Sequence, residues 1–165
     1  MADRIDELVA QWNAERPDLD AGVMAEVARL LHVARLIGGR LAAYAGEHGL
    51  QVGEADVLLT LRRSGEPYRL SPTALAESLL ISTGAMTNRL DRLEARGLVS
   101  REPHPSDRRA LEIALTPEGR RLVDEVVGGH VENEREMLSA LNDREREQLT
   151  RITRKLLAHL GESGG

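Results

Sequence analysis

The sequence predicts a mainly α fold with a minor α+β part, and three observations lead to this prediction. Apolar residues recur at helical spacing along most of the 165 residues. Aromatic residues make up only 2% of the chain, so the core must consist of Leu, Val, Ile and Ala, a set more typical of packed helices than of a β-sandwich. Gly, Pro and N-cap residues separate the apolar runs. The length fits a single domain.

Two helices are expected in the N-terminal part of the chain. Ile5, Leu8 and Trp12 lie on one face of a helix over residues 3–13, which ends before a proline. A longer helix over residues 21–47 has apolar residues at the same spacing, and a glycine follows its end.

Three shorter helices are expected in the middle of the chain. The first, over residues 52–65, ends at a glycine, and the segment EPYRLSP that follows is expected to be a loop. Ser71 is the predicted N-cap of the second helix, with Pro72 at its first position. A tight turn at Ser82 opens the third helix, which continues to about residue 95.

Two strands and two long helices complete the predicted order. Residues 98–101 and 111–115 are strand candidates, and the turn EPHPSDRR joins them. The motif TPEG supplies an N-cap and a proline for a helix that runs to about residue 138, and a last helix is expected over 143–160. Helix, helix, tight turn, helix and hairpin is the order of a winged helix-turn-helix, here over residues 53–116.

The third of the short helices has the composition of a helix that reads DNA. At about 100° per residue, Met86, Leu90 and Leu93 share one face and are expected to pack inward. The opposite face, which also includes Asp91, has small, uncharged residues at its centre, where an ordinary exposed face of so charged a chain would carry more Glu and Lys. Such residues can approach base edges, and the free amides at the helix start can bind a phosphate. The predicted DNA-binding residues are Ser71, Ser82, Thr83, Gly84, Thr87, Asn88 and Arg92.

Positive charge is concentrated in the same region. Residues 62–109 contain nine Arg against six Asp or Glu, although the whole chain has a net charge of -5. A local basic face on an acidic chain permits DNA binding, because the interaction with phosphates is short-ranged in salt. At the tip of the predicted wing, Arg108 and Arg109 are expected to enter a minor groove, and Asp107 is expected to orient Arg108.

These motifs together resemble the MarR family of bacterial transcriptional regulators. The resemblance depends on DVLLTLRRSG, STGAMTNRLDRLEARGLV, DRR and LTPEG, and it covers about residues 23–160. It implies a single MarR-type domain over 1–165, a homodimer and a pseudo-palindromic DNA site. Dimerisation helices are then expected in 1–50 and 117–160, where apolar residues exceed the needs of one small core. Val123, Val126, Val127, Val131, Leu138, Leu149, Ile152, Leu156 and Leu160 are expected at the subunit interface.

A narrower resemblance concerns the urate-responsive branch of that family. This branch has an additional N-terminal helix with a Trp, an Asp before the reading motif, and two Arg. The matching positions here are Trp12, Asp56, Arg89 and Arg101, and the resemblance implies that they bind a small aromatic or urate-like ligand. A ring, two guanidiniums and a carboxylate can hold a flat, anionic heterocycle. Each residue also has a structural reading, Trp12 as a core aromatic and Asp56 as a first-turn acid.

The leading hypothesis is a homodimeric, ligand-responsive repressor that binds double-stranded DNA. The alternatives are a constitutive or metal-responsive DNA-binding regulator and a helical adaptor that binds protein. No phosphate loop, metal-ligand spacing or catalytic triad is found, so the sequence predicts neither an enzyme nor a cofactor. No cysteine is present, and no apolar stretch is long enough to cross a membrane, so we expect a cytoplasmic protein that does not contact membranes.

Overall fold

The computed structural model describes residues 3–104 and 110–161. The chain divides into two compact units, Met1–Gly53 and Glu54–Gly165, and each is considered separately below. No helix of the described residues is long and apolar enough to span a membrane.

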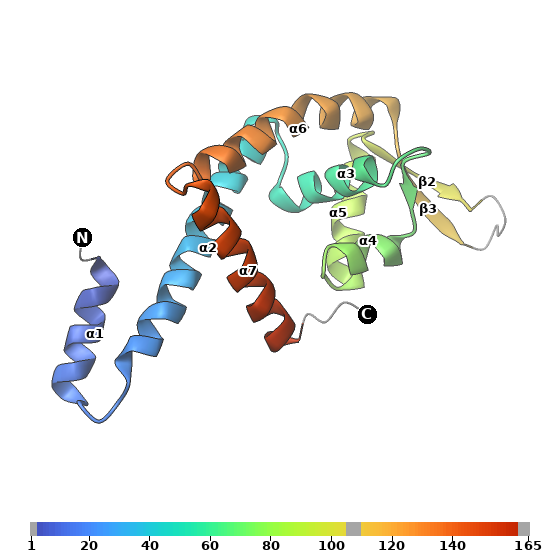
Figure 1. Ribbon diagram of the computed structural model, residues 1–165. Helices are drawn as coiled ribbons and strands as arrows, with labels where there is room; N and C mark the ends of the chain where they lie inside the picture. The colour runs from blue at the N-terminus through green and yellow to red at the C-terminus, as the bar shows by residue number, and fades with distance from the viewer. Residues whose placement is uncertain (1–2, 105–109, 162–165) are drawn as a thin grey trace. The chain divides into compact units, whose positions relative to one another are not determined.

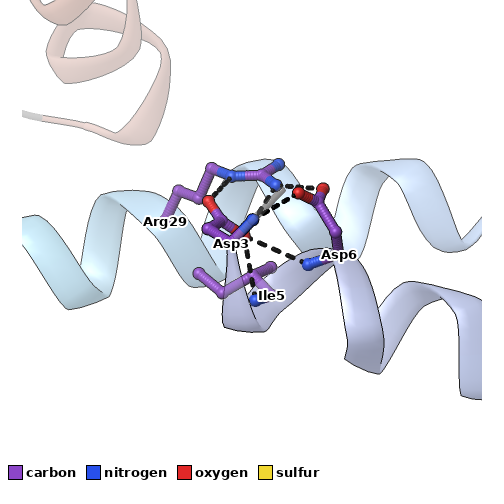
Figure 2. A network of polar contacts seen from close by, with 4 residues as sticks. All are labelled: Asp3, Ile5, Asp6 and Arg29. Atoms are coloured by element: carbon purple, nitrogen blue, oxygen red, sulfur yellow. Dashed lines mark hydrogen bonds and ion pairs between the residues drawn. The ribbon is translucent and has the colours of Figure 1, made fainter. Parts of the chain in front are cut away.

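The first unit is a pair of helices, α1 (Arg4–Glu15) and α2 (Ala21–Glu47). Both match their predicted positions. Asp3 caps α1 by accepting hydrogen bonds from the amides of Ile5 and Asp6. Arg29 of α2 donates two hydrogen bonds to the same carboxylate, at 2.8 Å and 3.0 Å. The cap of one helix is therefore joined to the side of the other (Figure 2). None of the residues of α1 is buried within this unit, so α1 contributes little to a core of its own.

The second unit contains the remaining helices and a small sheet (Figure 1). Its helices are α3 (Val52–Arg63), α4 (Pro72–Ser78), α5 (Thr83–Ala95), α6 (Pro117–Met137) and α7 (Asp143–Leu160). Its strands are β1 (Arg69–Leu70), β2 (Val99–Pro103) and β3 (Leu111–Leu115), antiparallel in the order β1-β3-β2. The fold is therefore mainly helical with a small sheet, as the sequence predicts.

The predicted N-caps explain where these helices begin. Ser71, Ser82 and Thr116 each accept a hydrogen bond from the backbone amide three residues later, and Pro follows at the first position of α4 and α6. Asn142 caps α7 with Glu145 in a reciprocal capping box. The starts of α4 and α5, the two helices on either side of the tight turn, are thus set locally by hydroxyl side chains.

One prediction about the loops is wrong. The segment EPYRLSP, expected to be a loop, contains β1, in which Arg69 pairs with Ala114 and Leu70 with Ile113. Two residues are too few to show an alternating pattern, so only the partner strand reveals them. The sheet consequently has three strands and not the predicted two.

The core of the second unit lies between α3, α4, α5, α6 and the sheet. Its fully buried side chains include Leu58, Leu61, Leu75, Leu90 and Ile113. Val123 and Val126 of α6 are each only 2% exposed within this single chain. They belong to the chain's own core, which corrects the expectation that they lie at a subunit interface.

Candidate nucleic-acid interface

Helix α5 has one face in the core and one face in solvent. Met86, Leu90 and Leu93 are 1%, 2% and 0% exposed, as the helical wheel predicts. Their burial fixes the rotation of α5 about its own axis, so the opposite side of the helix must face outward.

The outward face of α5 is small, polar and open. Ser82, Thr83, Gly84, Thr87 and Asn88 are all exposed. The Ser82 hydroxyl accepts from the Ala85 amide at 3.3 Å, and the Thr87 hydroxyl donates to the Thr83 carbonyl at 3.0 Å. A methyl group added to Gly84 would have no neighbour within 4 Å, so the surface is flat enough for another molecule to come close to the backbone.

Arg92, predicted as a DNA contact, has a partner within the chain. Its Nε donates to Oε1 of Glu54 at 2.8 Å, and Arg96 reaches Oε2 of the same carboxylate at 3.5 Å. Glu54 is only 3% exposed, whereas the Arg92 side chain remains 46% exposed. The carboxylate is thus an internal anchor for two arginines one helical turn apart on α5.

A second ionic tie joins α5 to the sheet. Arg101 of β2 donates to Asp91 at 2.5 Å and also to Glu94, and these hydrogen bonds raise the pKa of Arg101. The latter half of α5 is therefore held by charged groups of α3 on one side and of β2 on another, while its first half presents the open polar face.

The predicted wing residues Asp107, Arg108 and Arg109 lie outside the described residues. The strands that lead to them are described, and β2 and β3 pair from Val99 with Leu115 to Pro103 with Leu111. Ser71 is partly buried at the start of α4, where its hydroxyl caps the helix.

The predicted ligand residues fall into three places. Asp56 of α3 is half-buried, and burial raises the pKa of its carboxyl, while electrostatic interactions with Arg89 and His130 partly oppose this rise. Arg101 is engaged with Asp91 and Glu94. Trp12 belongs to the first unit, where it is 43% exposed beside a cavity of about 150 Å³.

Sequence reasoning missed two ionisable residues of this lobe. His130 of α6 acts on Asp56 from an element remote in sequence, and its Nε2 lies 3.3 Å from Oε1 of Glu134. In the sequence, Glu54 resembles any acid in the first turn of a helix. The available signal is the pair Arg92 and Arg96, because two like charges four residues apart on a helix favour an acidic partner between them.

No group of three or more His, Asp or Glu side chains suited to a metal ion occurs among residues 3–104 and 110–161.

The order of α3, α4, α5 and the wing strands defines a winged helix-turn-helix protein.

Comparison with known proteins gives the family. A model described as MarR family matches residues 48–110. The transcriptional regulator PecS of Dickeya dadantii is 40% identical over 156 residues, 94% of each chain. The transcriptional repressor YetL of Bacillus subtilis is 27% identical and covers 87% of this chain and 85% of its own. Sco3205, a MarR-family regulator of Streptomyces coelicolor solved in complex with DNA, has a TM-score of 0.80 at 27% identity, covering 88% and 91%.

The chain belongs to the MarR family of transcriptional regulators. It is therefore a regulator and not an enzyme.

Proposed function

We propose that the protein is a homodimeric repressor that binds a pseudo-palindromic operator and is released by a small anionic aromatic ligand. The observation that carries DNA binding is the open, polar first half of α5, from Ser82 to Asn88, on a lobe whose other half is held by ion pairs. In this arrangement α5 enters a major groove, and the wing contacts the adjacent minor groove or backbone.

A repressor role agrees with the relatives. YetL is named a repressor, and Sco3205 was solved bound to DNA. Two copies related by a two-fold axis would place their α5 helices about one DNA turn apart, which explains a pseudo-palindromic site.

Ligand release would act through a population shift. The bound ligand favours a spacing of the two DNA-binding lobes that no longer fits one turn of DNA. Asp56 and Arg89, together with Arg101 and Trp12, are the proposed contacts. A constitutive regulator is the second candidate, because Arg101 already has two carboxylate partners within the chain.

DNA binding is tested with fluorescence anisotropy on a duplex from the region upstream of the protein's own gene. We expect specific, salt-dependent binding, and Arg108→Ala should weaken binding to all duplexes and reduce the salt slope by about one. Failure of the wild-type protein to shift any specific duplex at low salt would overturn the repressor proposal. An unchanged affinity for Arg108→Ala would overturn the wing assignment alone.

Ligand binding is tested by titrating Trp12 fluorescence with urate and with salicylate. Trp12 is the only Trp of the chain, so any quenching reports on this residue. Trp12→Ala and Arg89→Ala should retain DNA binding and lose ligand-induced release. A flat titration with both compounds, together with DNA binding that neither compound reverses, would favour the constitutive regulator.

A further inference from the structure

Glu54 occupies a position that folding stability alone does not explain. It lies in the first turn of α3, and its side chain is only 4% exposed. Removing a carboxylate from water costs several kcal/mol, and a buried ion pair is often no more stable than apolar side chains of the same volume. An apolar residue would therefore fill this place at least as well if packing were the only requirement.

Two partners of Glu54 come from α5, the helix that is proposed to face the DNA. Arg92 and Arg96 are four residues apart on α5 and approach the two oxygens of one carboxylate, at 2.8 Å and 3.5 Å. The side chains of both Arg are more than a third exposed, so each guanidinium has one side toward Glu54 and another toward solvent.

We infer that Glu54 is a positioning residue for DNA recognition, which acts through Arg92. The inference rests on the proposed DNA-binding function. The hydrogen bond from Arg92 uses Nε, and the two terminal amino groups of a guanidinium can still donate to a phosphate. An Arg whose plane is held in advance loses less side-chain freedom on binding than one that is free in solvent. Glu54 thus holds α5 against α3 and aims Arg92 at the phosphate that sets the register of α5 in the groove.

Charge and positioning make opposite predictions for Glu54→Gln. The substitution removes one negative charge beside the DNA-binding face, so electrostatics alone would tighten binding to every duplex. If Glu54 positions Arg92, the neutral amide holds the guanidinium less firmly, and binding to the specific duplex weakens. Discrimination between specific and random DNA therefore separates the two explanations.

The experiment compares wild type and Glu54→Gln on two duplexes over a range of salt concentrations. One duplex is selected by the wild-type protein from a random library, and the other is a scrambled sequence of equal length. We expect Glu54→Gln to weaken binding to the selected duplex about fivefold or more, and to bind the scrambled duplex as well as wild type or better. Glu77→Gln, which removes an exposed acid of α4, is the matched charge control and should weaken binding to neither duplex.

Two further variants connect the effect to Arg92. In an Arg92→Ala background, Glu54→Gln should no longer weaken binding to the selected duplex. Arg92→Lys retains the charge but lacks the Nε donor, and it should lose affinity for the selected duplex only. If Glu54→Gln does not fold, as judged by circular dichroism, Arg92→Lys decides the question.

Tighter binding of Glu54→Gln to both duplexes, or an equal loss in the presence and absence of Arg92, would overturn the inference while leaving DNA binding itself intact. No selected duplex for the wild-type protein would instead count against the proposed function.

Discussion

Asp56 is a carboxylate in an unfavourable place. It is half-buried, and burial raises its pKa more than the charges of Arg89 and His130 lower it. An acid whose pKa is raised on folding stabilises the folded chain at low pH, and this contribution is lost as the pH rises through the folded value. At neutral pH, Asp56 therefore reduces stability, which is common for residues retained for function.

Asp56→Asn should consequently raise the thermal stability at pH 7. The position is only half-buried, so solvent limits the gain to about 1–2 °C in Tm. The gain should shrink as the pH falls toward the pKa of the carboxyl, because Asp56 is then neutral in the wild type as well. Thermal unfolding followed by circular dichroism at several pH values measures this, with the exposed acid variant Glu125→Gln as the control. A lower Tm for Asp56→Asn at pH 7 would contradict the argument.

Asp3 shows the opposite shift. The pKa of its carboxyl is lowered from 3.8 to about 2, chiefly by the hydrogen bond with Arg29 and to a smaller extent by the backbone amides of Asp6 and Ile5, while desolvation opposes the shift (Figure 2). Because the pKa is lowered on folding, the ion pair between α1 and α2 contributes its full stabilisation above about pH 4. This stabilisation is lost as the pH falls from the unfolded pKa of 3.8 toward the folded pKa of about 2.

Arg29→Gln should return the pKa of Asp3 toward 3.8, because the first cause of its shift is removed. A carboxyl NMR titration measures this residue by residue. The second exposed pair of this unit provides the control, since Arg16 likewise lowers the pKa of Asp18. Arg16→Gln should raise the pKa of Asp18 and leave the pKa of Asp3 unchanged. A pKa of Asp3 that stays near 2 without Arg29 would assign the shift to the helix cap.

At the scale of single residues, the sequence predicts helix caps well and ion pairs poorly. Ser71, Ser82 and Thr116 could be assigned because a cap and its amide are three residues apart. Glu54 with Arg92 and Arg101 with Asp91 are joined only by the fold, over 38 and 10 residues. Their partners follow from how α3, α5 and β2 pack, and no local pattern encodes that.

At the scale of the elements, the start of α6 lies very close to the backbone of Leu98, the residue before β2. A Cβ added to Gly119 would lie 1.9 Å from the backbone carbonyl oxygen of Leu98. The backbone of Leu98 is fixed by its own hydrogen bonds, from its amide to the Leu93 carbonyl and from the Thr116 amide to its carbonyl. Neither chain segment can give way easily.

Gly119→Ala should therefore destabilise the second unit by about 1–3 kcal/mol, or more if the start of α6 is displaced. Gly128→Ala on the same helix is the matched control, because a methyl group there meets nothing within 4 Å. It should stabilise the helix by about 0.5–1 kcal/mol. Urea unfolding of both variants measures the difference. Equal stabilities would mean that the start of α6 does not pack on Leu98 as described.

The long helices are the elements that the sequence defines most completely. The predicted ranges 21–47 and 143–160 are those of α2 and α7, because capping signals and apolar periodicity agree at both ends. Strand β1 was missed because its two residues are ordered by pairing with β3, a contact made across more than 40 residues of chain. Elements that depend on local signals are predictable, and those that depend on a distant partner are not.

At the scale of the whole molecule, each of the two units exposes many apolar side chains. Val23, Val27, Leu30 and Leu31 of α2 are between 49% and 68% exposed. On α6 and α7 the exposed apolar residues are Val127, Val131, Leu149, Ile152, Leu156, Leu157 and Leu160. Within each unit these residues recur at helical spacing, and large exposed apolar surfaces mark interaction sites. These helices are the ones proposed for the dimer, and a second copy is the occupant that this proposal assigns to their apolar faces.

Ile152→Asp should convert the protein to a monomer of 18.1 kDa and strongly reduce its affinity for a two-fold symmetric duplex. Ile152 is 50% exposed at helical spacing from Leu149 and Leu156, so a carboxylate there would have to be buried without a partner on dimerisation. Thr150→Asp adds the same charge to another face of α7 and should leave a dimer. Size-exclusion chromatography with light scattering gives the mass, and anisotropy gives the affinity. A dimeric Ile152→Asp variant that binds DNA normally would exclude this face of α7 from the subunit interface.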